Sequence, residues 1–178
     1  IPLAEYLGLI TSIGDYVLEE ACRQCRYWNE HGMPDFHINV NLSVVQLLQK
    51  DIVDTVAKVL KRTGVNPVNI VLEITESFAI NDMDRVLNII NGIRELGPKI
   101  ALDDFGTGYS NLSSISRLTP DIVKIDRGFT VKALKHKYEN QLMENIIELV
   151  HSIDLKICLE GVETNEELKE LNRLNPNY

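Results

Sequence analysis

The sequence is poor in cysteine and in positive charge, and it lacks long apolar runs. Its 178 residues include 3 cysteines, too few for a disulfide framework, which fits a reducing compartment. The 18 Lys and Arg against 26 Asp and Glu give a net charge of −8, which argues against DNA or an anionic membrane surface as the main partner. No apolar run approaches the roughly 18 residues of a membrane span, and no signal-peptide layout opens the chain. We therefore expect a cytoplasmic domain, whether or not its parent protein is anchored in a membrane.

Two of the cysteines, Cys22 and Cys25, have the C-x-x-C spacing of a redox motif or of half a zinc site. However, no second pair follows them, and Cys25 lies in an apolar stripe of helical spacing that also contains Val17 and Trp28. We therefore expect both cysteines to be buried core thiols. The four histidines show no metal-ligand spacing: His31, His37, His136 and His151.

Short stretches of alternating apolar and polar residues predict five strands. They lie at 37–43, 69–75, 100–104, 121–126 and 155–160. In the first of them, Ile38, Val40 and Leu42 share one face, while Asn39, Asn41 and Ser43 share the other. Each predicted strand is thus apolar on one face and polar or small on the other.

A predicted helix follows each strand, and two helices precede the first one. The first two helices are expected at 2–10 and then up to about 31, the second with Thr11 or Ser12 as its N-cap. Capping boxes at Ser43–Gln46 and Thr164–Glu167 indicate where two of the later helices begin. After 126, we expect a polar, lysine-rich loop before the helix that contains Ile146 and Val150.

The regular alternation of strands and helices predicts an α/β fold with parallel strands joined by right-handed crossovers. Both an open doubly wound sheet and a (β/α) barrel satisfy this pattern. Interior strands of an open sheet are usually apolar on both faces, whereas the strands here are apolar on one face only. The pattern favours a TIM-like barrel with a polar interior mouth, formed by a single domain over 1–178.

Polar side chains recur at the carboxyl end of each predicted strand. They are Asn41, Glu73, Asp103 with Asp104, Lys124 with Asp126, and Glu160 with Glu163 just beyond. The carboxyl ends of barrel strands converge on one mouth, which is where such enzymes carry out their chemistry. An isolated acidic residue at a strand end is usually only exposed to solvent there. Polar residues at the strand ends of five successive units, however, predict a shared site.

The candidate ligands are carboxylates and one amide, without histidine or cysteine. Oxygen donors of this kind select hard cations, Mg²⁺ or Mn²⁺. The adjacent Asp103 and Asp104 would repel each other without a cation and can flank two ions, as in many phosphoester hydrolases. Lys124 can then place positive charge on the attacking water or on a phosphate oxygen, and Glu160 can accept a proton. The pattern outlines a metal-assisted phosphodiesterase.

A glycine loop for a dinucleotide is the main competing interpretation of this region. Gly106 and Gly108 lie between a predicted strand and a predicted helix, but Asn111 stands where the third glycine of G-x-G-x-x-G is needed. Two carboxylates would also face the pyrophosphate of such a ligand. We therefore expect the loop to supply polar tips or a lid and not a dinucleotide site.

At these same positions the sequence resembles the EAL-domain cyclic di-GMP phosphodiesterases, over essentially all 178 residues. The matching motifs are N-L-S at 41–43, E-I-T-E-S at 73–77, D-D-F-G-T-G-Y-S at 103–110, K-I-D at 124–126 and E-G-V-E-T at 160–164. The resemblance implies a barrel that linearises cyclic di-GMP to pGpG with a two-metal site of Mg²⁺ or Mn²⁺. It also implies that Asn41, Glu73 and Asp103 hold one metal, and that Asp103 with Asp104 holds the second.

The resemblance assigns roles to the remaining polar residues as well. Glu160 would be a metal ligand or the general base, and Lys124 would contact the catalytic water or the phosphate. Glu76 would anchor the loop after Asp104, while Asp126 and Glu163 would support the ligands from behind or face the substrate.

The chain also departs from the family pattern, because the Glu-Ala-Leu segment and the C-terminal Gln-Gly-Tyr segment are not in it. We expect an incomplete barrel of about five strands, which lacks the first two strands and the last. Such a chain would be part of a longer protein, and two of its strand edges would be bare. For such a truncated chain, an inactive cyclic di-GMP receptor or interaction module is the alternative to an enzyme. Expected partners are cyclic di-GMP, a sensory or GGDEF-type domain in the parent protein, and a second copy of the chain.

Overall fold

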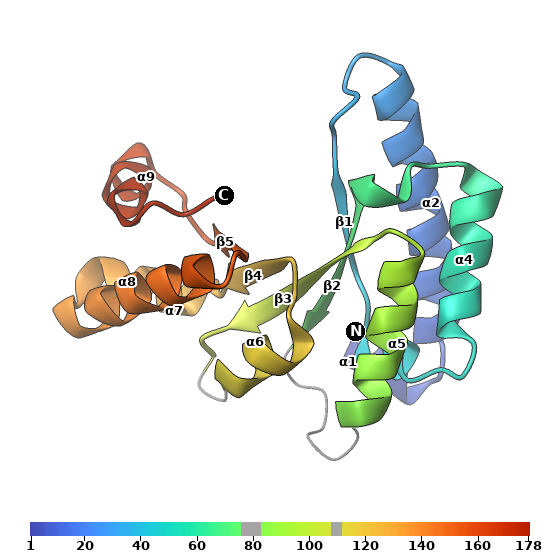
Figure 1. Cartoon of the computed structure of the whole chain (residues 1–178), viewed down its shortest axis with the longest axis horizontal. Helices are drawn as coiled ribbons and strands as arrows, with labels where there is room; N and C mark the ends of the chain where they lie inside the picture. The colour runs from blue at the N-terminus through green and yellow to red at the C-terminus, as the bar shows by residue number, and fades with distance from the viewer. Residues whose placement is uncertain (76–82, 108–111) are drawn as a thin grey trace. The chain divides into compact units, whose positions relative to one another are not determined.

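The computed structural model describes residues 1–75, 83–107 and 112–178, and it divides into two compact units. The first unit is Ile1–Ile100 and the second is Ala101–Tyr178. In each unit strands alternate with helices along the chain (Figure 1). The units are described in turn below.

The first unit contains two parallel strands and the helices that precede and follow them. Its elements are α1 (Pro2–Tyr6), α2 (Ile10–Glu30), β1 (Ile38–Asn41), α3 (Val44–Leu47), α4 (Ile52–Thr63), η1 (Pro67–Asn69), β2 (Ile70–Thr75), α5 (Met83–Glu95) and the start of β3 (Lys99–Phe105). Strands β1 and β2 pair in parallel, with Asn41 opposite Glu73. In Figure 1, α2, α4 and α5 lie together on one side of these strands.

Helix α2 begins earlier than the sequence predicted. The expected N-cap at Thr11 or Ser12 is wrong, because the helix starts at Ile10 and its N-cap residue, Leu9, makes no side-chain cap hydrogen bond. Ile10 is buried, so packing fixes the first turn where no cap does. The prediction of core thiols is confirmed: Cys22 and Cys25 are fully buried, and burial raises the pKa of Cys22 to about 12.

The capping box after β1 is confirmed, but the helix that it opens is short. Ser43 accepts a hydrogen bond from the backbone N–H of Gln46, whose side chain reaches back to the N–H of Ser43. The helix ends at Leu47, and a separate helix α4 begins at Ile52. The capping box therefore opens a short helix that is separate from α4. Gly64 ends α4 in the left-handed conformation.

The second unit continues the same alternation. After the end of β3 come α6 (Leu112–Leu118), β4 (Ile122–Ile125), α7 (Arg127–Lys135), α8 (Lys137–Ser152), β5 (Lys156–Leu159), α9 (Asn165–Leu171) and η3 (Asn172–Leu174). Strand β4 pairs in parallel with β3 and with β5. Leu102, Val123 and Ile157, one from each strand, are fully buried and form part of the unit's core. The capping box Thr164–Glu167 is confirmed at the start of α9.

The polar, lysine-rich loop expected after 126 is wrong, because this stretch is helix α7. Asp126 is its N-cap, and its Oδ1 accepts a hydrogen bond from the N–H of Gly128 at 2.7 Å. Phe129 and Ala133, four residues apart, are buried and anchor one face of the helix. Lys132 and Lys135 in its last turn are favourably placed for the helix dipole. A cap and two apolar anchors thus outweigh the polarity of the segment.

The outer edge of β5 is paired by the last residues of the chain. The N–H of Tyr178 donates to the carbonyl of Ile157 at 3.1 Å, and its own carbonyl accepts from the N–H of Leu159 at 3.0 Å. This pattern is that of a parallel strand pair. The Oδ1 of Asn177 also accepts from the N–H of Ile157 at 2.8 Å. The expectation that this edge is bare is therefore wrong.

Candidate functional site

In the first unit, the structure brings Asn41 and Glu73 side by side at the ends of β1 and β2. The two residues are register partners, and the backbone carbonyl of Glu73 accepts a hydrogen bond from the N–H of Leu42 at 2.8 Å. Glu73 is 5% exposed, whereas Asn41 is exposed. Oε1 of Glu73 accepts a hydrogen bond from Nδ2 of Asn39 at 2.7 Å. Asn39 was not among the predicted site residues, although its place on the same strand face as Asn41 was the signal that could have identified it.

In the second unit, a buried lysine links two carboxylates from neighbouring strands. Nζ of Lys124 lies 3.0 Å from Oδ1 of Asp103 and 2.7 Å from Oε1 of Glu160. Asp103 and Lys124 are both 8% exposed. Their strands are hydrogen-bonded neighbours, so parallel pairing brings these ends together. The structure thus unites three of the predicted site residues.

Asp104 joins this group through an irregularity in β3. Successive strand residues point to opposite faces, so two adjacent carboxylates do not normally share one face. Here the register of β3 against β4 shifts between Leu102 and Phe105, and Asp104 has a left-handed φ of 58°. Asp104 is exposed, yet partial desolvation raises its pKa, and the nearby carboxylates of Asp103, Asp126 and Glu160 raise it further, while Lys124 opposes them. The bulge therefore brings Asp104 into the field of the same cluster.

Asp126 and Glu163 are held by contacts that support the backbone around the cluster. Asp126 caps α7, as described above. Oε1 of Glu163 pairs with Nη2 of Arg127 at 2.5 Å, with both side chains largely exposed. Gly161 has a φ of +77°, and a Cβ built there would lie 2.2 Å from Cγ of Arg127. The Arg127 stem therefore packs directly over the turn that follows Glu160.

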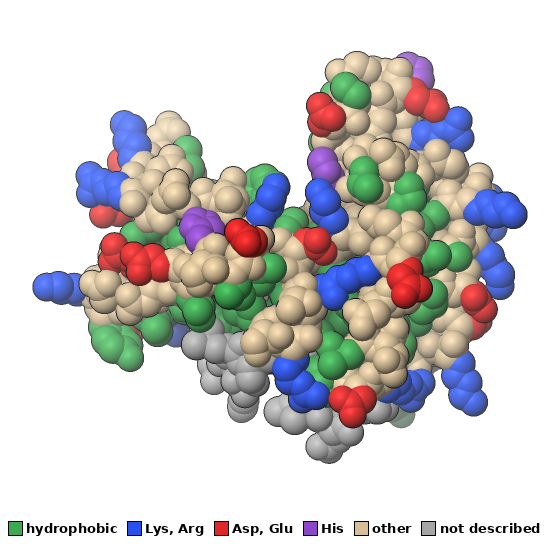
Figure 2. All heavy atoms as spheres, in the orientation of Figure 1, with side chains coloured by type: hydrophobic (Ala, Val, Ile, Leu, Met, Phe, Trp, Pro, Cys, Tyr) green, Lys and Arg blue, Asp and Glu red, His purple; other side chains and the backbone are tan. Residues whose placement is uncertain are grey.

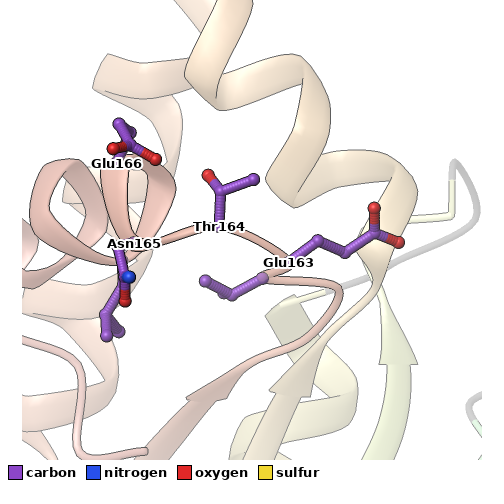
Figure 3. A pocket seen from close by; sticks show the side chains of 6 residues that line it. Glu163, Thr164, Asn165 and Glu166 are labelled. Carbon is purple, nitrogen blue, oxygen red and sulfur yellow. The ribbon is translucent and has the colours of Figure 1, made fainter.

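Beyond this turn, a pocket opens at the start of α9, with Glu163, Thr164, Asn165 and Glu166 around it (Figure 3). Oε2 of Glu167 accepts hydrogen bonds from the N–H groups of Glu163 at 2.8 Å and Thr164 at 3.0 Å. These hydrogen bonds cap the start of α9, so the Glu167 carboxylate and the two N–H groups are already used in beginning that helix.

Glu76, predicted to anchor the loop after Asp104, lies outside the described residues.

The predicted oxygen ligands fit a hard divalent cation in their chemistry. Over residues 1–75, 83–107 and 112–178, no group of three or more His, Cys, Asp or Glu side chains is gathered closely enough to hold a metal ion. Yet Oδ1 of Asp103 is buried and makes no hydrogen bond within the described residues, and its ion-pair partner is Lys124. A buried carboxylate oxygen of this kind can ligate a cation, in competition with the ammonium group of Lys124. In the first unit, Glu73 and the amide of Asn41 offer oxygen donors at adjacent positions.

Figure 2 shows acidic and basic side chains interspersed on the visible side of each unit. No helix in the described parts of the chain is long and apolar enough to cross a membrane.

Comparison with known proteins identifies the family. The model of the EAL domain matches residues 1–178. The chain belongs to the EAL-domain family. It is 42% identical over 177 residues to the bifunctional diguanylate cyclase/cyclic di-GMP phosphodiesterase MucR of Pseudomonas aeruginosa, covering 99% of this chain and 26% of that protein. It is 34% identical over 168 residues to the cyclic di-GMP phosphodiesterase NbdA of Pseudomonas aeruginosa, covering 94% of this chain and 22% of that protein.

A solved structure confirms the fold of this EAL domain. The PaMucR phosphodiesterase, solved as a complex with c-di-GMP, has a TM-score of 0.92 and 43% sequence identity, over 99% of this chain and 71% of that one. The predicted fold class is therefore confirmed as α/β of the TIM-like barrel type, here with five parallel strands and their helices. The chain spans about a quarter of the length of the curated relatives named above.

Proposed function

We propose that this EAL domain, within its parent protein, hydrolyses cyclic di-GMP to linear pGpG in bacterial second-messenger signalling. Membership of a family whose relatives are named cyclic di-GMP phosphodiesterases supports the substrate class. The observation that carries the chemistry is the Asp103–Lys124–Glu160 cluster, in which Asp103 and Lys124 are buried, with Asp104 electrostatically coupled to it. Such a cluster combines carboxylate donors, a cation and a proton acceptor at the carboxyl ends of parallel strands, where the fold places catalysis.

The proposal includes two divalent cations, Mg²⁺ or Mn²⁺, held by oxygen donors. The ligands proposed are Asn41, Glu73, Asp103, Asp104 and Glu160. When bound, such ions polarise the phosphoryl oxygens and lower the pKa of a bound water. The family membership and the all-oxygen donor set within each unit support these assignments.

The residues of the second unit would share the remaining work. The ammonium group of the buried Lys124 would lie near the phosphate or the attacking water and would stabilise negative charge there. The carboxylate of Glu160, more exposed than Asp103, can accept the proton that the attacking water loses. Asp126 and Glu163 would hold the flanking backbone through α7 and Arg127, and Glu76 would anchor the loop after Asp104.

The proposal extends to the setting of the domain. A parent protein with a sensory or GGDEF-type domain is supported by the short span that this chain covers in its relatives, one of which is also named a diguanylate cyclase. We propose a cytoplasmic location, because cyclic di-GMP signalling acts there, and a homodimer as the assembly. The chain would form one part of a barrel domain, without the first two strands and the last.

A test of the proposal is to incubate the full-length protein with cyclic di-GMP and Mg²⁺ or Mn²⁺ and to follow the appearance of pGpG. Turnover that is lost in Asp103→Asn supports the enzyme. The rate of pGpG formation should fall by more than about 100-fold. Loss of a hydrogen-bond partner of a metal ligand usually costs about 10- to 100-fold, and Asp103→Asn changes a proposed ligand itself. Absence of pGpG under all conditions would overturn the enzymatic proposal.

The alternative is an EAL domain that binds cyclic di-GMP without hydrolysing it. The specific observation that favours it is the ion pairing of Lys124 with both Asp103 and Glu160, which gives each of these two carboxylates a cationic partner within the chain. Binding of cyclic di-GMP by calorimetry, together with no turnover at any Mn²⁺ concentration, would establish this receptor function.

A further inference from the structure

The side chains of Asn39 and Asn41 leave the same face of β1 and flank the carboxylate of Glu73. They are two residues apart on one strand, so they point to the same side. Asn41 is the register partner of Glu73, whereas Asn39 is the partner of Val71, two residues earlier on β2. The Nδ2 of Asn39 nevertheless reaches Oε1 of Glu73, at 2.7 Å. The Glu73 side chain therefore leans back along its strand toward Asn39.

The chemistry of this hydrogen bond fixes which atom of Asn39 faces Glu73. A carboxylate can only accept, so the amide nitrogen must be the atom that points toward it. The bond is charge-assisted and lies against a side chain that is 5% exposed, which makes it stronger than a bond between two neutral groups. It also restricts the rotation of the Glu73 carboxylate about its last torsion, which is otherwise broad.

An amide donor leaves the charge of the carboxylate in place. A lysine in the same position would neutralise it, as Lys124 does for Asp103 in the second unit. Asn39 thus orients the carboxylate through a neutral donor, which does not itself cancel the negative charge that attracts a cation. Hydrogen bonds of this kind to ligating carboxylates are a common feature of protein metal sites.

We infer that Asn39 is a positioning residue for the metal ion proposed at Glu73 and Asn41, its side-chain amide holding the Glu73 carboxylate in the orientation that binds the cation. The inference rests on the metal site proposed above. It adds a residue that the sequence motifs do not contain, since the N-L-S motif begins only at Asn41.

The test measures Mn²⁺ affinity of the full-length protein without substrate, by electron paramagnetic resonance of the free ion. Asn39→Leu removes the donor and keeps a side chain of similar size. We expect it to weaken Mn²⁺ binding about 10- to 100-fold, the usual effect of losing an outer hydrogen-bond partner. Asn91→Leu, an exposed asparagine of α5 in the same unit, is the matched control and should bind as the unaltered protein does. Asn39→Gln, which keeps the amide, should recover part of the affinity.

Thermal unfolding of each variant separates positioning from a purely structural role. A structural role would lower the melting temperature but leave Mn²⁺ affinity unchanged at a temperature where the variant is folded. If Asn39→Leu does not fold, Asn39→Ser, which is smaller and still polar, takes its place, with the same weakening expected.

The outcomes also separate this inference from the proposed function. Equal Mn²⁺ affinity in Asn39→Leu and the unaltered protein, with loss of binding in Glu73→Gln, overturns the role of Asn39 and leaves the metal site standing. Absence of Mn²⁺ binding in the unaltered protein overturns both the metal site and the role of Asn39.

Discussion

The two units of the chain hold their buried carboxylates in different ways. In the first unit, Glu73 is held by the neutral amide of Asn39, at 2.7 Å. In the second, Asp103 is held by the ammonium group of Lys124, at 3.0 Å, and the same lysine pairs with Glu160. We call the first arrangement the amide-held carboxylate and the second the lysine-bridged pair.

The difference shows that burial of an acid does not by itself prepare it for a metal ion. An amide donates a hydrogen bond to a carboxylate without itself cancelling the charge, so this bond does not weaken the attraction for a cation as an ion pair would. A lysine cancels the charge, so a cation must compete with an ion pair that is already formed. We therefore expect the amide-held carboxylate to favour cation binding and the lysine-bridged pair to favour stability of the metal-free fold.

Removing the lysine should have the largest effect on stability. Lys124→Met leaves Asp103 and Glu160 without their shared cation while keeping the length of the side chain. Because Asp103 is 8% exposed, we expect the free energy of unfolding to fall by about 3 kcal/mol, the lower end for breaking a buried ion pair. Denaturant unfolding of the metal-free protein measures the change.

The matched control for this variant is Lys169→Met, which changes an exposed lysine of α9. It should alter stability by no more than about 0.5 kcal/mol, as is usual for surface substitutions. Equal stability of Lys124→Met and Lys169→Met would show that the lysine-bridged pair contributes nothing to the fold.

A methyl group at the turn after Glu160 should have the next largest effect. Gly161→Ala adds a Cβ at a φ of +77° and 2.2 Å from Cγ of Arg127, so both strain and a collision oppose it. Gly8→Ala is a matched control, with a φ of +69° and no atom within 4 Å of the new Cβ. We expect about 1 kcal/mol of destabilisation from backbone strain at Gly8, and about 1 kcal/mol more at Gly161 from overpacking, the lower end of that effect.

Equal melting temperatures for the two alanine variants would contradict the packing of Arg127 over this turn. If the packing is as described, the activity of Gly161→Ala should also fall, because the turn carries Glu160 into the lysine-bridged pair. Gly8→Ala should retain full activity.

The smallest effect is expected at Asp104, where the sign of a pH dependence is the test. Partial desolvation and neighbouring carboxylates raise the pKa of Asp104, so the folded metal-free protein binds its proton more tightly than the unfolded chain. Stability should therefore decrease as pH rises from the ordinary pKa of an aspartate, near 4, through the raised folded value. Asp104→Asn removes the carboxylate whose ionisation is disfavoured in the folded protein, so this variant should be slightly more stable than the unaltered protein at pH 7.

Melting temperatures at pH 4 and pH 7, with and without Mn²⁺, measure this effect. The difference in melting temperature in favour of Asp104→Asn should grow from pH 4 to pH 7 in the metal-free protein and disappear when Mn²⁺ is bound. A variant that is less stable than the unaltered protein at pH 7 without metal would show that the Asp104 carboxylate is not under repulsion.

Much of the fold was predictable because its signals are local. The capping boxes at Ser43 and Thr164 begin helices as predicted, since each is a pattern of two residues within one turn. Helix α7 was missed because its composition is polar, and its stability comes from the Asp126 cap and from burial of Phe129 and Ala133. Burial depends on tertiary packing, which no local pattern contains.

The site was predictable as a set of residues but not as a set of contacts. Recurrence of polar residues at strand ends identified Asn41, Glu73, Asp103, Lys124 and Glu160 as candidates. The sequence could not show that a register shift and a left-handed Asp104 bring two adjacent carboxylates to one cluster. Nor could it show that Asn39 on β1 donates a hydrogen bond to Glu73 on the neighbouring β2, because that contact depends on the parallel register.

The most direct test of the account is removal of the metal ions from the full-length protein. We predict that treatment with a chelator abolishes linearisation of cyclic di-GMP, and that added Mn²⁺ or Mg²⁺ restores it. Zn²⁺ or Ca²⁺ should restore less, because Zn²⁺ prefers nitrogen and sulfur donors and Ca²⁺ takes a larger coordination shell than Mg²⁺ or Mn²⁺. Hydrolysis at an unchanged rate by the metal-free protein would contradict the proposal that these strand-end carboxylates act through bound cations.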